Sequence, residues 1–139
     1  MIQVKLLSEE AKLPTKANET DAGWDLYSTI DAEIGVGQRK LLPTGVSMAI
    51  PTGYYGRIAD RSGNAFSLGL HVLAGVIDTG YSGELKVLLV NLSDVAVEIK
   101  RAHRIAQIII TSISNLPLEQ VSELDTTDRG ASGFGSSGR

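Results

Sequence analysis

Short apolar segments separated by turn-forming residues occupy most of this chain. Ile2, Val4 and Leu6 alternate with polar neighbours, which is typical of a strand with one buried face. Gly, Pro, Asn and Asp then interrupt the apolar segments about every ten residues. No sustained helical period occurs before residue 115, although a short helical turn fits residues 65–68. The pattern predicts an all-β domain with a jelly-roll or β-barrel-like fold.

Residues 75–91 form the most informative stretch of this pattern. An apolar pair precedes one acid, Asp78, and a turn containing Gly80 and Gly83, after which residues 85–90 have the composition of a buried strand. We predict a β-hairpin with one carboxylate on its first arm, in which both glycines adopt positive φ. A purely structural hairpin with an Asp that caps the turn has the same local pattern.

Two predicted strands, residues 85–92 and 105–113, are apolar on both faces. A single antiparallel domain whose sheets have one solvated face does not explain such strands. In a chain of 139 residues, another copy of the chain is the simplest cover for the second face, so we predict a homo-oligomer.

Composition narrows the class of protein. The chain has 42% hydrophobic and 21% charged residues, which are values of a globular protein that fits one domain. A net charge of −3 argues against binding to duplex nucleic acid, and zero cysteines exclude disulfides and Cys-based zinc sites. The N-terminus lacks a secretory signal pattern and no apolar run reaches the length of a membrane span. We expect a cytoplasmic protein, or a nuclear or virus-encoded intracellular one.

The C-terminal residues have a different composition. After Leu124 the sequence is rich in Gly, Ser and Thr, and Phe134 is its only large apolar residue. We therefore divide the chain into a β-domain of residues 1–125 and a mobile arm of residues 126–139 that closes over an active site. Glycines free backbone N–H groups to meet phosphates, and an aromatic ring stacks on a base. A frayed terminus without a function has a similar composition.

Five short stretches together resemble the motifs of the trimeric dUTPase family. They are AGWDLYS (22–28), GRIADRSGNA (56–65), GVIDTGYSGE (75–84), RIAQIII (104–110) and RGASGFGSSG (129–138). The resemblance implies a jelly-roll homotrimer whose active sites are shared between subunits. It also implies a dUTP diphosphatase that hydrolyses dUTP to dUMP and pyrophosphate by Mg²⁺-assisted attack of water at the α-phosphorus. Such an enzyme keeps uracil out of DNA and supplies dUMP for dTMP synthesis.

The resemblance also assigns roles to individual residues. Asp78 matches the catalytic acid that deprotonates the attacking water, and Tyr81 matches the ring that excludes a 2′-hydroxyl. Asp25 matches a residue that contacts Mg²⁺ through water, although a turn-capping Asp fits it equally well. The implied substrate-binding residues are Arg61, Ser62, Gly63, Val72, Gly75, Val76, Ile77, Tyr81, Lys86, Gln107, Arg129, Phe134, Gly135, Ser136 and Ser137.

Within this set, the resemblance implies that Arg61, Ser62, Gly63 and Gln107 bind the phosphates, and that the hairpin backbone binds uracil. It also implies that Arg129 and the serine hydroxyls bind the γ-phosphate, and that Phe134 stacks on uracil. For Gln107, the alternative is a core amide that is paired within the fold.

Some residues depart from the family pattern. Asp60 stands where a Pro usually precedes the RSG sequence, which places a negative charge beside the expected triphosphate. Gly80 replaces a frequent second Asp, so Asp78 is the only acid of the predicted hairpin. Asn64 and His103 also differ from the usual residues, and we interpret His71 and His103 as structural or solvated.

Three other interpretations compete with a dUTPase. A dCTP deaminase shares the fold but needs its own acid for the cytosine amine, for which Glu84 is the nearby candidate. A catalytically idle descendant would bind dUTP or a protein partner, and a jelly-roll structural protein would do neither. Measuring pyrophosphate release from several nucleotides separates these possibilities.

Overall fold

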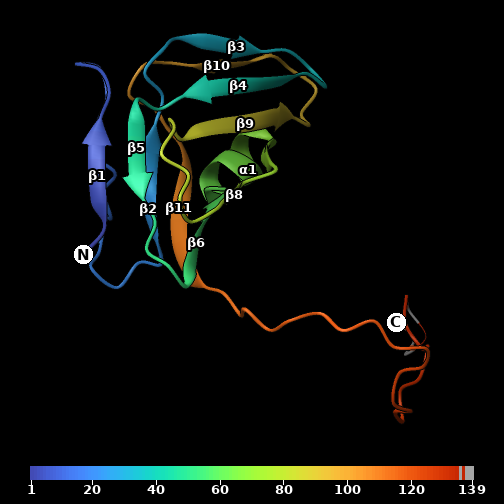
Figure 1. Ribbon diagram of the computed structural model, residues 1–139. Coiled ribbons are helices and arrows are strands. Elements are labelled where there is room, and N and C mark those ends of the chain that lie inside the picture. Colours follow the sequence, from blue (N-terminus) through green and yellow to red (C-terminus); the bar gives the residue numbers. More distant parts are fainter. Residues whose placement is uncertain (135, 137–139) are drawn as a thin grey trace.

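The computed structural model describes residues 1–134 and residue 136. Eleven strands and one short helix are found in this part of the chain (Figure 1). They are β1 (Gln3–Leu6), β2 (Gly23–Tyr27), β3 (Ala32–Ile34), β4 (Arg39–Pro43), β5 (Val46–Ala49), β6 (Tyr54–Ala59), α1 (Ser62–Leu68), β7 (Leu70–Leu73), β8 (Val76–Ile77), β9 (Lys86–Asn91), β10 (Val97–Ile99) and β11 (Arg104–Ser112). The helix coincides with the predicted helical turn and extends it by three residues toward the N-terminus.

The strands pair in antiparallel fashion in four groups, ordered β2-β11-β6-β8, β4-β9-β7, β1-β5 and β10-β3. Figure 1 shows β3, β10, β4 and β9 crossing the top of the molecule, while β1, β5, β2 and β11 run below them in a crosswise direction. Their inward faces enclose one core. Its fully buried members are mainly Leu, Ile and Val, as the scarcity of aromatics predicts, and include Leu26, Leu42, Leu85, Val87, Leu89, Ile105 and Ile108.

The predicted hairpin over residues 75–91 is wrong as a pair of strands. β8 pairs with β6, whereas β9 lies between β4 and β7 in a different sheet. The intervening turn therefore carries the chain from one sheet to the other. Sequence pattern identifies both strands but does not specify their partners, because pairing depends on the register and order of the whole sheet.

The outward face of β9 remains partly open to solvent. Leu88 and Val90 are only half-buried, and Leu41, which lies opposite Leu88 on β4, is 53% exposed. The second apolar face expected from the sequence is thus present.

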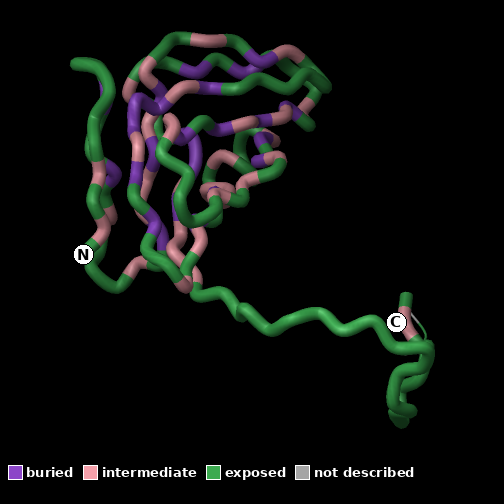
Figure 2. The backbone as a smooth tube through the Cα atoms, in the orientation of Figure 1, coloured by how far each residue is buried: buried purple, intermediate pink, exposed green. Residues whose placement is uncertain are grey.

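After Ser112 the chain leaves the packed body as an extended arm (Figures 1 and 2). Residues 112–132 are all exposed, including Leu116, Leu118 and Leu124. The predicted boundary at residue 125 stays a prediction, but the departure from the β body begins earlier in the chain. Within the described residues, no helix is apolar and long enough for a transmembrane span.

Candidate functional site

A polar cavity of about 350 Å³ opens between the start of α1, β2 and β11. We call it the Arg61 pocket. Its lining residues are Ala17, Asp21, Ala22, Gly23, Asp25, Arg61, Ser62, Gly63, Arg104 and Gln107. The strand β11 lies between β2 and β6, and α1 follows β6 directly, so antiparallel pairing alone brings these distant segments to one place.

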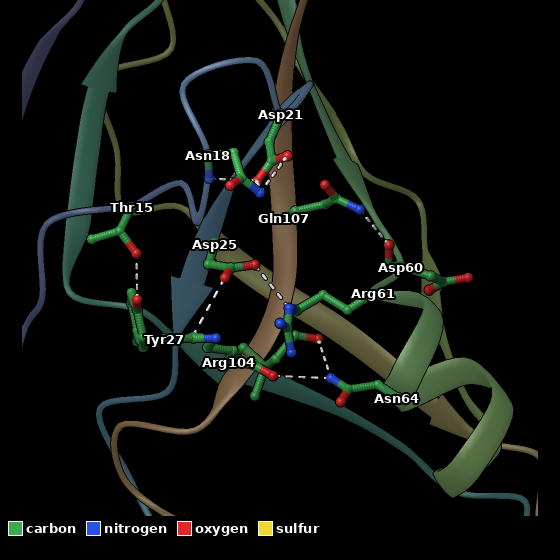
Figure 3. Close-up of polar contacts among 11 residues, drawn as sticks. Thr15, Asn18, Asp21, Asp25, Tyr27, Asp60, Arg61, Asn64, Arg104 and Gln107 are labelled. Carbon is green, nitrogen blue, oxygen red and sulfur yellow. Dashed lines mark hydrogen bonds and ion pairs between the residues drawn. The ribbon is translucent and has the colours of Figure 1, made fainter.

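Asp25 holds two guanidinium groups in this pocket (Figure 3). Arg61 Nε donates to Oδ1 at 2.8 Å, and Arg104 Nε lies 3.4 Å from Oδ2. The Asp25 side chain is 16% exposed, so these contacts are partly shielded from water. Because Nε of each guanidinium faces Asp25, the terminal nitrogens remain to bind an anion in the pocket.

The chain approaches the pocket through the first turn of α1. Arg61 is the N-cap residue with extended φ and ψ of −91° and 129°. A Cβ built on Gly63 would meet nothing within 4 Å, so this backbone is open to a ligand. Asn64 Nδ2 donates to the Arg104 carbonyl at 2.9 Å and ties the helix to β11. A guanidinium and an open helical turn therefore lie side by side.

Gln107 has a fixed orientation at the side of the pocket. Its Nε2 donates to the Asp60 carbonyl at 2.8 Å, so an amide flip would set two carbonyl oxygens against each other. Its Oε1 occupies the space that a side chain at position 23 would need, because a Cβ built on Gly23 would lie 2.3 Å from this oxygen. Gly23 thus makes room for the amide. The Gln107 amide is paired within the fold, as the alternative interpretation expects, and it also lines the pocket, while its contact with phosphate stays a prediction.

Residues 74–81 form a second polar segment with its own geometry. Ala74 and Gly75 have φ of 60° and 97°, so both residues of the connection between β7 and β8 lie in the left-handed region. The carbonyl of Asp78 accepts the N–H of Tyr81 at 3.2 Å, and Gly80 has φ of 84°. Asp78 is exposed on this turn.

Tyr81 is held by its own turn. Its hydroxyl donates to the Glu84 carbonyl at 3.0 Å, and a Cβ on Gly83 would lie 2.5 Å from the Tyr81 hydroxyl oxygen. The prediction of positive φ holds for Gly80 but is wrong for Gly83. Gly83 instead allows the close approach of the ring of Tyr81, which is 46% exposed.

Comparisons with known proteins cover nearly the whole chain. The dUTPase family model matches residues 9–138. The deoxyuridine 5'-triphosphate nucleotidohydrolase of Solanum lycopersicum is 46% identical over 136 residues, which are 98% of this chain and 80% of the tomato protein. This chain belongs to the dUTPase family.

Solved dUTPase structures agree with this fold. A mutant dUTPase of Staphylococcus bacteriophage 80alpha with dUpNHpp has a TM-score of 0.95 at 30% identity, over 100% of this chain and 99% of the phage chain. A mutant dUTPase of phage phi11 of S. aureus, described with a structural Mg(II) ion, has a TM-score of 0.84 at 28% identity, over 91% and 99% of the two chains. The predicted jelly-roll fold is confirmed.

Within one chain of this dUTPase, the predicted site residues fall into separate groups. Asp25, Arg61, Ser62, Gly63 and Gln107 meet in the Arg61 pocket. Val72 lies on β7, just before the second polar segment, and that segment contains Gly75, Val76, Ile77, Asp78 and Tyr81. Tyr81 lines a different cavity, with Lys5 and Ser47.

The remaining predicted residues lie outside both groups. Lys86 starts β9, and its Nζ lies 3.8 Å from Glu84. Arg129, Phe134 and Ser136 are on the exposed arm. Gly135 and Ser137 fall outside the described residues.

Sequence reasoning missed Arg104 and Asp21 as pocket residues. Arg104 and Gln107 are three positions apart on a strand, which normally places two side chains on opposite faces. A register shift between Arg104 and Ala106 changes this relation. The bulge has no clear sequence signal, whereas Asp21 lies one residue before a recognised motif and could have been included with it.

Proposed function

We propose that this chain is a dUTP diphosphatase that converts dUTP to dUMP and pyrophosphate. The observation that carries the proposal is the pair of guanidiniums held by Asp25 beside the open backbone of Gly63. This arrangement suits the phosphate chain of a nucleotide. The family match over residues 9–138 and a structural relative described with dUpNHpp support dUTP as that nucleotide.

In the proposed reaction, Asp78 accepts a proton from the attacking water. The water oxygen forms a bond to the α-phosphorus while the bond from that phosphorus to the bridging oxygen of the β-phosphate breaks. Pyrophosphate leaves with the electron pair of the broken bond. The carboxylate of Asp78 is exposed and open to water, as a general base requires.

The charges around the Arg61 pocket support a requirement for Mg²⁺. Arg61 and Arg104 are balanced by Asp21 and Asp25, so these four side chains bring no excess positive charge to a triphosphate. Among the described residues, no cluster of three acidic, His or Cys side chains could form a cage for a metal. This donor set fits an ion held by phosphate oxygens and water, with Asp25 contacting the water through its remaining lone pairs. Bound Mg²⁺ would neutralise phosphate charge.

Base and sugar recognition are assigned to the second polar segment. The positive φ values of Ala74 and Gly75 shape a backbone segment that we assign to hydrogen bonds with uracil, and such a site discriminates strongly against a different base edge. Tyr81, fixed by Glu84 and Gly83, presents a ring whose position excludes a 2′-hydroxyl.

A complete active site is proposed to form in a homotrimer. The half-buried outer face of β9 and the exposed leucines of the arm are apolar surfaces that another copy would cover. Arg129, Phe134 and Ser136 would then reach a nucleotide on a neighbouring subunit, with Gly135 and Ser137 assigned to the same arm. Removing dUTP keeps uracil out of DNA, and its product dUMP serves dTMP synthesis.

Pyrophosphate release from dUTP, dCTP, dTTP and UTP tests the proposal. We expect rapid release from dUTP alone, and loss of that release when EDTA removes divalent metal. Ammonia release from dCTP would instead indicate a deaminase. Tight binding of dUTP without hydrolysis would indicate a catalytically idle relative, and the Asp78→Asn variant provides the inactive control for every substrate.

A further inference from the structure

Asp60 connects three segments of the fold through both its side chain and its backbone. Its Oδ1 accepts the N–H of Val72 at 2.6 Å, and its Oδ2 lies 2.6 Å from Nδ1 of His71. Its carbonyl accepts Gln107 Nε2 at 2.8 Å, and the next residue is Arg61. One residue therefore links β7 to two phosphate-binding side chains of the Arg61 pocket.

The Asp60 carboxylate faces away from the Arg61 pocket. Figure 3 shows it on the opposite side of the chain from the Arg61 guanidinium. It lines a separate cavity of about 350 Å³ together with His71, Val72 and Arg57. The charge that the sequence places beside the triphosphate is thus directed to partners in β7.

The position of β7 explains why this contact is favourable. β7 is the edge strand of the β4-β9-β7 sheet, and Val72 is 8% exposed. The Asp60 carboxylate accepts the backbone N–H of Val72, which as part of an edge strand would otherwise lack a partner in the sheet. This hydrogen bond is charge-assisted and is therefore stronger than one between neutral groups. His71 can donate from Nδ1 either as the cation or as a neutral tautomer, so this second contact persists in both forms. The Val72 N–H is consequently occupied by Asp60, so the predicted main-chain contact of Val72 with uracil would have to use its carbonyl group.

We propose that Asp60 is a positioning residue that sets Arg61 and Gln107 for the triphosphate through its anchors on Val72 and His71. This inference rests on the proposed function of the Arg61 pocket. Anchoring the carboxylate fixes the backbone of residue 60. The carbonyl of residue 60 orients the Gln107 amide through their hydrogen bond. Because Arg61 is the next residue, the same backbone also determines where the Arg61 side chain points.

The positioning role and a simple charge effect predict opposite results. If Asp60 acts only as a negative charge near the substrate, its removal lowers KM for dUTP, because repulsion is relieved. If Asp60 positions the phosphate-binding side chains, its removal raises KM, because Arg61 and Gln107 lose their fixed geometry.

The test compares Asp60→Ala and Asp60→Asn with Asp94→Asn. Asp94 is an exposed acid in the loop between β9 and β10, so its substitution controls for the loss of one negative charge. We expect Asp60→Ala to raise KM for dUTP about tenfold, as the loss of two hydrogen bonds implies, with a smaller change in kcat. Asp60→Asn keeps an acceptor for Val72 and should recover part of the loss. An unchanged or lowered KM in Asp60→Ala would overturn the inference.

Hydrogen exchange provides a readout that does not depend on catalysis. The Val72 amide should exchange faster in Asp60→Ala than in the parent, while that of Leu89 on the neighbouring strand should change little. If the parent fails to hydrolyse dUTP, the proposed function fails, yet the exchange rates still test the anchor. If the parent is active and both the Val72 exchange and KM are unaffected by Asp60→Ala, the positioning role is refuted.

Discussion

Replacing Gly23 by alanine tests the role of Gln107 without removing its amide. A Cβ at residue 23 would lie 2.3 Å from Oε1 and 3.0 Å from Cδ of Gln107. Gly23 is not among the positive-φ residues, so the substitution perturbs the neighbouring side chain and not the backbone conformation. The amide must move, and its bond to the Asp60 carbonyl is then lost.

The expected cost follows from these contacts. Overpacking of this kind typically costs about 1–3 kcal/mol, and the lost hydrogen bond adds about 1 kcal/mol, so Gly23→Ala should lose about 2–4 kcal/mol of unfolding free energy. Gln107→Ala alone should lose about 1–2 kcal/mol. In the double variant only the 3.1 Å contact with Cβ of residue 107 remains. Its cost should be smaller than the sum of the single costs by about 1–2 kcal/mol.

Urea unfolding at one fixed protein concentration measures these costs, because association contributes to apparent stability. Gly63→Ala is the matched glycine control: its Cβ meets nothing within 4 Å in α1, so it should stabilise the fold by about 0.5–1 kcal/mol. In kinetics, Gly23→Ala and Gln107→Ala should show similarly raised KM for dUTP. The assigned orientation of Gln107 would be refuted if the two single losses of unfolding free energy added up in the double variant. It would also be refuted if Gly23→Ala had the same KM for dUTP as the parent protein.

Four further predictions concern residues outside the Arg61 pocket. Asp78→Asn should leave the unfolding transition unchanged and lower kcat by about 10²–10⁴, and a kcat within threefold of the parent would remove Asp78 from the mechanism. Tyr81→Ala should admit UTP, measured as a fall in the ratio of kcat/KM for dUTP over UTP; an unchanged ratio would assign sugar discrimination elsewhere. A chain ending at Asp128 should keep its elution volume in size exclusion and its thermal midpoint but lose most of its kcat. Full activity of that chain would make the arm dispensable. Phe134→Ala alone should weaken binding of a dUTP analogue by about 1–3 kcal/mol in calorimetry.

Local sequence pattern was sufficient for the elements but not for their partners. The continuous apolar run from Val87 to Val90 identifies β9, and the burial of Val87 and Leu89 agrees. The same pattern cannot choose between β8 and β4 as neighbours, because both offer apolar side chains. The strand pairing depends on the whole sheet, so the hairpin expected at Asp78 became a turn between two sheets.

The candidate site was predictable to a similar extent. Motif order identified Arg61 and Gln107 as pocket residues, and the structure places both there. The register shift that brings Arg104 to the same pocket has no local signature in the sequence. The contacts of Asp60 were also unforeseen, since its carboxylate depends on a strand ten or more positions away in the chain, beyond α1. Such long-range contacts can be inferred only after the fold is known.

The separation of these groups explains why one chain would make an incomplete enzyme. In the Arg61 pocket, two arginines face two aspartates, which leaves a triphosphate in need of further cations. Arg129 could supply one, but it lies on the arm, which extends away from the body in Figure 1. The same arm exposes Leu116 and Leu118, whose burial against another copy would offset the cost of ordering it. In the proposed trimer, subunit association and substrate binding would supply the two things that one chain lacks, cover for its exposed apolar surface and further positive charge, through one segment of the chain.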